Sequence, residues 1–110
     1  MTVSIQAQAA EYSSLGNDPD LHELVEEYIS EMPDRLAAFG AAFKSGDLEL
    51  LRRTTHQMKG AAGSYGFNQV TPYAAKLESA IVDNRPIDEI CKLLDELLGM
   101  CLRLRAGSPD

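Results

Sequence analysis

The chain lacks tryptophan, has only two cysteines and two histidines, and contains no long apolar run. No stretch approaches the ~20 apolar residues of a membrane-spanning helix, and the first residues lack the basic and apolar regions of a signal peptide. Basic residues are also few, 10 lysines and arginines against 17 aspartates and glutamates, for a net charge of −7. An acidic chain without a basic cluster predicts neither nucleic acid nor an anionic membrane as its partner.

The scarcity of cysteine and histidine also limits the chemistry that the chain can support. With two scattered residues of each type, we expect no metal site. Cys91 and Cys101 would lie about 15 Å apart on one helix, too far for a disulfide, and are expected to be core residues in a reducing cytoplasm. No glycine-rich nucleotide loop is present, so we expect no bound cofactor and no ATP site.

What is present is a strong helical pattern. At 110 residues and 45% hydrophobic, the chain is long enough for one domain with a modest core. Apolar residues recur at spacings of three and four in long segments that are separated by short turns. This pattern predicts an all-α fold, an antiparallel four-helix bundle over residues 18–105, with a tail at 106–110. The four expected helical segments are 19–44, 47–63, 67–82 and 87–104.

The ends and breaks of these segments are less regular. Residues 1–17 contain some alternating apolar residues, but no second strand follows to form a hairpin, so we expect a short additional N-terminal helix at 9–15. Pro33 removes a backbone hydrogen bond, which predicts a kink or break near 30–32. Asp47 is expected to cap the second segment.

The start of the next helix stays open from the residues alone. Phe67-Asn68 or Thr71-Pro72 could begin it, since a proline is comfortable only in the first turn of a helix.

One stretch places a histidine, a lysine and glycines close together. His56, Lys59 and Gly60 stand at positions i, i+3 and i+4, so they share one helix face, and Arg52 and Gly63 extend that face by a turn either way. An imidazole is mostly unprotonated near neutral pH and is then a competent nucleophile. A lysine beside it can attract an anionic group. A glycine in mid-helix leaves the backbone bare at a cost of about 1 kcal/mol relative to alanine.

These residues form a motif with regular spacing, His56-x-x-Lys59-Gly60-x-x-Gly63-x-x-Gly66-Phe67. The motif resembles the signature of histidine-containing phosphotransfer (HPt) domains, and it is closest to the type found at the N-terminus of chemotaxis histidine kinases. Leu77-Glu78 falls where that family places Leu-Glu on the following helix. The resemblance is most specific over residues 47–82 and extends more loosely over 18–104.

The resemblance implies a function and a role for each matching residue. His56 would accept a phosphoryl group on Nε2 from a receiver-domain aspartyl phosphate and pass it to another response-regulator aspartate. Glu78 would accept a hydrogen bond from Nδ1–H of His56, and Lys59 would lie near the phosphoryl oxygens. The partner receiver domain would supply Mg²⁺. The chain would therefore be a stoichiometric phosphocarrier and not an enzyme.

Several residues keep more than one interpretation. Glu78 could instead be a solvated carboxylate that pairs with Lys76 or Arg85. Gly60 could allow close helix packing instead of clearing space for a partner. The candidate docking surface for a receiver domain consists of Arg52, Gln57, Gly60 and Gly63.

The expected partners are response-regulator receiver domains, with a hybrid histidine kinase as a further candidate, and the protein is expected to be monomeric. Two alternatives stay open from the sequence. The chain could be the phosphoacceptor domain of a larger chemotaxis-type kinase, or a helical scaffold that binds a receiver domain without accepting phosphate. The other histidine, His22, is expected to be a surface residue without a role.

Overall fold

A computed structural model describes residues 10–15 and 18–106 of the chain. Within these ranges the protein is mostly helical, in agreement with the expected all-α class. The elements in chain order are β1 (Glu11–Tyr12), α2 (His22–Ser30), α3 (Met32–Lys44), α4 (Leu48–Ser64), η1 (Asn68–Val70), α5 (Thr71–Val82), α6 (Ile87–Leu102) and β2 (Leu104–Arg105).

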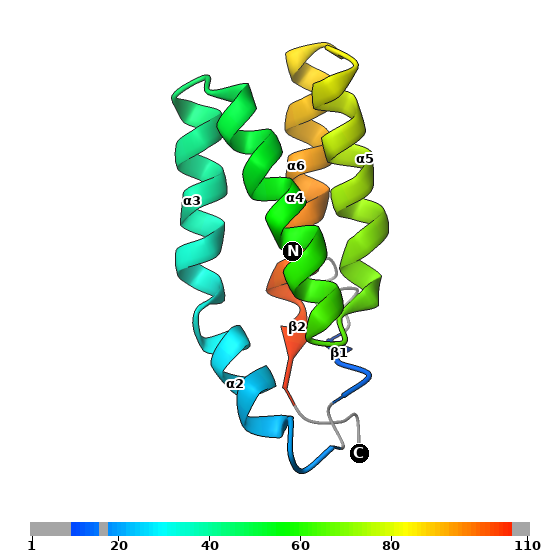
Figure 1. Ribbon diagram of the computed structural model, residues 1–110. Coiled ribbons are helices and arrows are strands. Elements are labelled where there is room, and N and C mark those ends of the chain that lie inside the picture. The colour runs from blue at the N-terminus through cyan, green and yellow to red at the C-terminus, as the bar shows by residue number, and fades with distance from the viewer. Residues whose placement is uncertain (1–9, 16–17, 107–110) are drawn as a thin grey trace, which may run out of the picture.

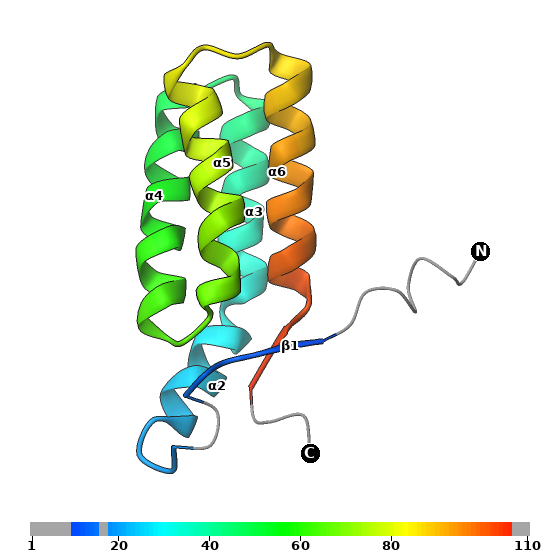
Figure 2. The same cartoon turned by 90° about the vertical axis from the view of Figure 1, so that its right-hand side faces the viewer.

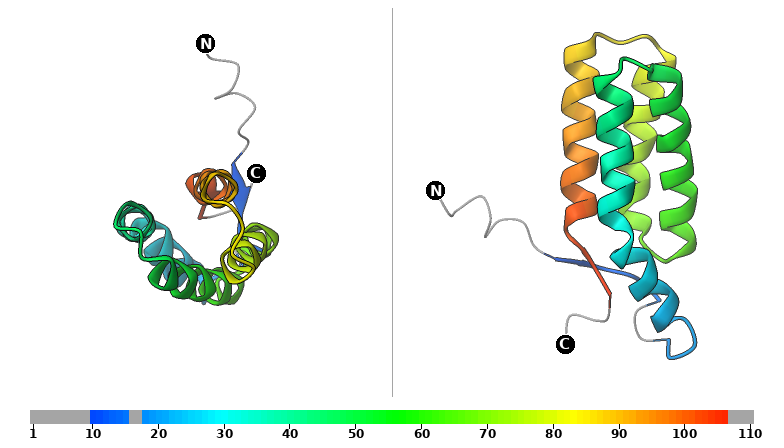
Figure 3. Two further views of the ribbon diagram at one scale, coloured as in Figure 1. Left: turned by 90° about the horizontal axis from the view of Figure 1, so that it is seen from above. Right: turned by 90° about the vertical axis from the view of Figure 1, so that its left-hand side faces the viewer.

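Four of the helices lie side by side along the long axis of the molecule (Figure 1). Helix α4 packs against α3 and α5, and α6 packs against α5 and α3, so that the four surround a common core (Figure 3). Successive turns between them lie at opposite ends of this group of four helices (Figure 2). Helix α2, which precedes α3 in the chain, lies beyond the lower ends of α4, α5 and α6 in Figure 2.

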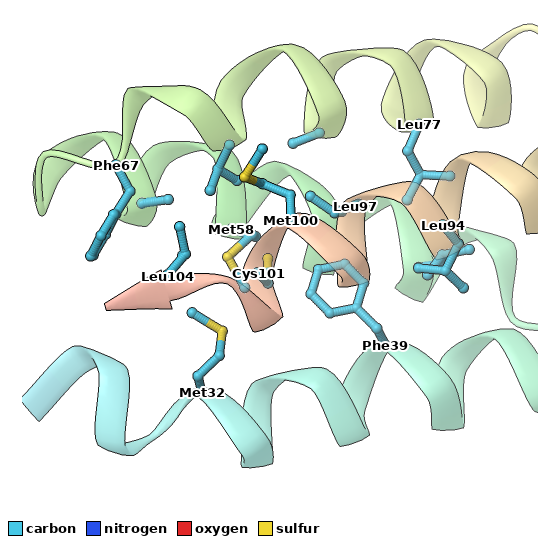
Figure 4. Close-up of a cluster of buried hydrophobic side chains, with 14 of the residues drawn as sticks. Met32, Phe39, Met58, Phe67, Leu77, Leu94, Leu97, Met100, Cys101 and Leu104 are labelled. Atoms are coloured by element: carbon cyan, nitrogen blue, oxygen red, sulfur yellow. The ribbon is translucent and has the colours of Figure 1, made fainter. Parts of the chain in front are cut away.

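The core is filled by side chains from all four of these helices and from the segment after α6 (Figure 4). Phe39 of α3, Leu51 of α4, Leu77 of α5 and Leu97 of α6 are all fully buried. Burying a side chain of this size contributes about 1.5–3 kcal/mol, which is why the apolar stripes fix how each helix is rotated about its axis. The rotation of α4 in turn decides where the histidine of the motif points.

The sequence of α4 explains both its start and its orientation. Asp47 is the N-cap, as predicted, and its Oδ1 accepts a hydrogen bond from the Leu50 backbone N–H at 3.0 Å. The buried stripe of this helix also follows the predicted spacing. Its buried residues are Leu51, Thr55, Met58 and Ala62.

The first long segment is divided into α2 and α3, as the proline predicted. Helix α2 ends at Ser30, and Pro33 lies in the first turn of α3, where its missing N–H costs no helical hydrogen bond. The Arg35 guanidinium holds this junction, because its Nη1 donates to the Tyr28 carbonyl at 2.8 Å and it lies 4.1 Å from the centre of the Tyr28 ring.

The second of the two possible starts of the following helix is observed. Helix α5 begins at Thr71 with Pro72 in its first turn, and the 3-10 turn η1 precedes it. Helix α6 ends at Leu102, two residues earlier than expected, because the chain then leaves the helix to form β2. Both cysteines of α6 are free; Cys101 is a core residue, whereas Cys91 is only half-buried.

The helix expected at residues 9–15 is wrong where the structure describes this segment; residue 9 lies outside the described ranges. Glu11 and Tyr12 form the strand β1, which pairs in parallel with β2, Glu11 opposite Leu104 and Tyr12 opposite Arg105. The local sequence indicates only whether a hairpin partner lies nearby. The actual partner lies at the other end of the chain, where no local pattern could indicate it.

The segment after β1 is fastened to the turn between α4 and η1. The Ser13 hydroxyl donates to the Tyr65 carbonyl at 2.5 Å, and the Ser14 N–H donates to the Gly66 carbonyl at 2.9 Å. Gly66 has a φ of +82°, and a Cβ at this position would collide with Ser13, Ser14 and the Leu15 side chain. Gly66 is therefore required both by its backbone conformation and by the segment that crosses it.

Gly66→Ala should lower the free energy of unfolding by more than Gly46→Ala, which is the matched control. Gly46 also has a positive φ, +75°, but a Cβ there would meet nothing within 4 Å. The control substitution should cost about 1–2 kcal/mol for the left-handed backbone alone, and Gly66→Ala should cost about 1–3 kcal/mol more for the collision. Urea unfolding of both variants measures the difference. Equal losses would mean that residues 13–15 do not pack against Gly66.

Candidate functional site

The histidine of the motif lies on the outer face of α4. Its neighbour Thr55 is fully buried, with its hydroxyl donating to the Leu51 carbonyl at 2.7 Å. One residue further along a helix is a rotation of about 100°, which carries His56 out of the core. The side chain of His56 is 64% exposed. A partner molecule can therefore reach the ring from solvent.

A carboxylate from the neighbouring helix holds this ring. His56 Nδ1 lies 2.9 Å from Oε2 of Glu78 on α5. An ionised carboxylate can only accept hydrogen bonds, so the proton of the neutral ring is on Nδ1. Nε2 is then the unprotonated nitrogen with an available lone pair.

The second oxygen of the same carboxylate is also occupied. Lys59 Nζ donates to Glu78 Oε1 at 2.8 Å, so that two residues of α4 meet one residue of α5. The Glu78 side chain is 17% exposed. The Lys59 ammonium holds the pKa of the Glu78 carboxyl below its usual range, with the His56 hydrogen bond acting in the same direction and partial burial opposing both. Glu78 is therefore ionised near neutral pH.

The alternative partners considered for Glu78 are not the observed ones. Arg85 pairs with Glu89, with 3.0 Å between Nη2 and Oε1, and Glu78 is bonded to His56 and Lys59. The interpretation of Glu78 as a solvated carboxylate paired with Lys76 or Arg85 is therefore wrong.

The two glycines of the candidate docking surface differ in their surroundings. A Cβ at Gly60 would meet nothing within 4 Å, so close helix packing does not explain this glycine. Gly63 lies inside α4, where a Cβ would make an ordinary contact with the Asn68 side chain at 3.9 Å. The helix continues to Ser64, one residue beyond the point where it was expected to unwind.

The two polar residues of that surface also belong to α4. Gln57 is exposed and lines a groove of about 240 Å³ between α3 and α4. Arg52 lies one turn before His56, where its Nε and Nη2 donate to the two oxygens of Glu49 at 3.0 and 2.6 Å. The sequence interpretation missed Glu49. Its position three residues before an arginine on a helix is a spacing that commonly forms ion pairs, and this could have indicated it.

His22, the other histidine, is on α2 and pairs with Glu26, at 2.7 Å between Nε2 and Oε1. In the part of the chain that the structure describes, no group of three or more histidine, cysteine, aspartate or glutamate residues is placed to hold a metal ion. None of the described helices combines the length and the apolar character needed to cross a membrane.

Fold and site together define a helical protein with an outward-facing histidine whose tautomer is set by a carboxylate. Comparison with protein-family models matches residues 23–107 to the Hpt domain, and the chain belongs to this family. No significant match was found among curated proteins or solved structures. Hpt domains take part in histidine phosphotransfer in phosphorelays, interact with receiver domains and histidine kinases, and are phosphocarriers without catalytic activity of their own.

Lys59→Met should raise the pKa of Glu78 toward its usual value, because the largest stabilising contact of the carboxylate is removed. The stabilisation from ionised Glu78 is present above its unfolded pKa and is lost as pH falls through the lower folded pKa, so it should become smaller in this variant. Carboxyl carbon NMR titration measures the pKa directly. Lys76→Met, the same charge change on α5, is the control and should leave the pKa of Glu78 nearly unchanged; equal shifts would show that Lys59 acts only through the overall charge.

Proposed function

We propose that this chain is a phosphorelay intermediate that accepts a phosphoryl group on His56 from a receiver-domain aspartyl phosphate and passes it to the aspartate of another response regulator. The observation that supports this most directly is the hydrogen bond between His56 Nδ1 and Glu78. It leaves Nε2 as the nucleophile on a ring that is exposed to solvent.

The transfer step balances without a proton leaving the ring. The Nε2 lone pair attacks phosphorus, the bond between phosphorus and the aspartyl oxygen breaks, and the carboxylate leaves with the electron pair. The ring keeps the proton on Nδ1 and becomes a phosphorylated imidazolium, whose positive charge the Glu78 carboxylate stabilises. In the second transfer the receiving aspartate attacks phosphorus, and the neutral imidazole leaves.

Positioning and charge neutralisation are what phosphoryl transfer chiefly requires. In this proposal Lys59 lies near the phosphoryl oxygens, and the acidic site of the receiver domain supplies Mg²⁺. In the same proposal the chain needs no cofactor and no ATP site of its own, and it acts as a stoichiometric carrier.

The proposed receiver surface is the face of α4 around the histidine, formed by Arg52, Gln57, Gly60 and Gly63. Gly60 supports this surface because a Cβ at this position would meet no other part of the described chain within 4 Å. A receiver loop could approach the helix closely at this point.

The domain organisation is part of the same proposal. Helices α3 to α6 would form an antiparallel four-helix bundle within an HPt unit at residues 18–105, with 1–17 as an N-terminal segment and 106–110 as a tail. The domain would act as a monomer in the cytoplasm, where free cysteines persist. Its partners would be response-regulator receiver domains and a hybrid histidine kinase.

His56→Gln should abolish labelling of the protein by a panel of phosphorylated receiver domains, whereas His22→Gln should not. His22 is a suitable control because it too forms a pair with a carboxylate, Glu26. Acid-labile, base-stable label on wild type marks a phosphohistidine.

Glu78→Gln should slow the transfer about 10- to 100-fold, the usual effect of losing a carboxylate that orients a functional histidine. Label on His56→Gln, or binding of a receiver without any label on wild type, would overturn the proposal.

Gly60→Ala should stabilise the protein and slow the transfer from a receiver domain. Replacing a mid-helix glycine should add about 0.5–1 kcal/mol to the free energy of unfolding, because the new methyl group meets nothing. Gly40→Ala on α3 is the matched control, with equally open surroundings, and should stabilise without slowing transfer. Thermal unfolding and transfer rates measure both effects. An unchanged transfer rate for Gly60→Ala would exclude close approach at this glycine.

A further inference from the structure

The face of α4 that bears His56 has a cation one turn before the ring and another one turn after it. Arg52 precedes the histidine by four residues, and Lys59 follows it by three, so both side chains can reach the ring. Each of the two has an acidic partner in the structure. Lys59 is bonded to Glu78, and both Nε and Nη2 of Arg52 are bonded to Glu49.

The two ion pairs differ in how easily the cation can leave its carboxylate. The Glu78 side chain is 17% exposed, so losing Lys59 would leave a charge that water reaches poorly. The Glu49 side chain is 62% exposed, so water can replace Arg52 there at little cost. Lys59 also helps to hold the carboxylate that orients the ring. Arg52 is therefore the cation that can move toward a new anion at His56 without disturbing the site.

A phosphoryl group on Nε2 of His56 would be such an anion. It would have a charge of about −2 and three acceptor oxygens, whereas Glu49 offers a single negative charge. A guanidinium binds phosphate oxygens with two parallel hydrogen bonds, a geometry that an ammonium cannot reproduce. Arg52 has the matching donors, already used in a bidentate contact with Glu49.

We propose that Arg52 forms a bidentate contact with the phosphoryl group on His56, and that Glu49 is a positioning residue that holds Arg52 aside while the histidine is unphosphorylated. Phosphorylation then exchanges one bidentate contact of Arg52 for another on the same helix face. The inference rests on the proposed function of His56 and adds the residue that stabilises the phosphorylated state.

The equilibrium of phosphoryl transfer between the domain and one receiver tests this assignment, because it depends on the free proteins and not on how they dock. Arg52→Gln should shift the equilibrium about tenfold toward the receiver, the usual effect of losing a charge-assisted hydrogen bond. Glu49→Gln should shift it about twofold toward phosphohistidine, since the competing helix pair is weak. In the Arg52→Gln background, Glu49→Gln should have no further effect.

Two controls separate a direct contact from the general effect of charge. Arg53→Gln removes the same charge from the neighbouring residue. The Nε atom of Arg53 lies 3.9 Å from Oε2 of Glu49, and its loss should shift the equilibrium much less than Arg52→Gln does. Glu89→Gln breaks an exposed pair between the first turn of α6 and Arg85 in the turn before it, and should change nothing. The NMR signal of the Arg52 Nε–H should also move when wild type is phosphorylated.

The possible outcomes are distinct. An unchanged equilibrium for Arg52→Gln, or an equal shift for Arg53→Gln, would exclude Arg52 as the phosphoryl ligand. An effect of Glu49→Gln that persists without Arg52 would show that Glu49 acts through its own charge and not by positioning. If wild type is never labelled on His56, the proposed function itself fails and this inference fails with it. Normal labelling without coupling between Glu49 and Arg52 overturns only the inference.

Discussion

The site depends on one carboxylate that two residues of the adjacent helix share. Glu78 of α5 accepts from His56 Nδ1 at 2.9 Å and from Lys59 Nζ at 2.8 Å. Because this side chain is partly buried, its oxygens gain from having partners in the protein, and both partners come from α4. The same contacts that orient the imidazole therefore also link α5 to α4 outside the core.

This contact is possible only because α4 has two chemically different faces. Thr55 and Met58, which precede and follow the exposed His56 in the sequence, are both buried on the core face, and the Thr55 hydroxyl is satisfied within its own helix. Behind α4, the Tyr28 hydroxyl contacts the Met58 sulfur at 3.1 Å, and its ring stacks on Tyr65 at 4.5 Å between centres. The helix is thus packed firmly on its inner side, which leaves its outer side free to meet a partner without losing its shape.

Features that depend on residues close in sequence could be predicted from the sequence. Asp47 caps α4, Pro33 separates α2 from α3, and the spacing of three places His56 and Lys59 on one helix face. Features that depend on how distant segments meet could not. The residues alone left Glu78 with several possible partners, because the rotation of α5 against α4 decides among them, and the partner of β1 lies at the opposite end of the chain.

The pairing of β1 with β2 has a mechanical consequence. The two strands run parallel, and among the described elements β1 precedes the helices while β2 follows them. Tension that pulled the chain before Glu11 and after Arg105 in opposite directions would slide one strand along the other and would load their hydrogen bonds together, in shear, instead of opening them one at a time. The short ladder would therefore bear the force before the helices did, and the helix with the histidine would be shielded from strain transmitted through the chain ends.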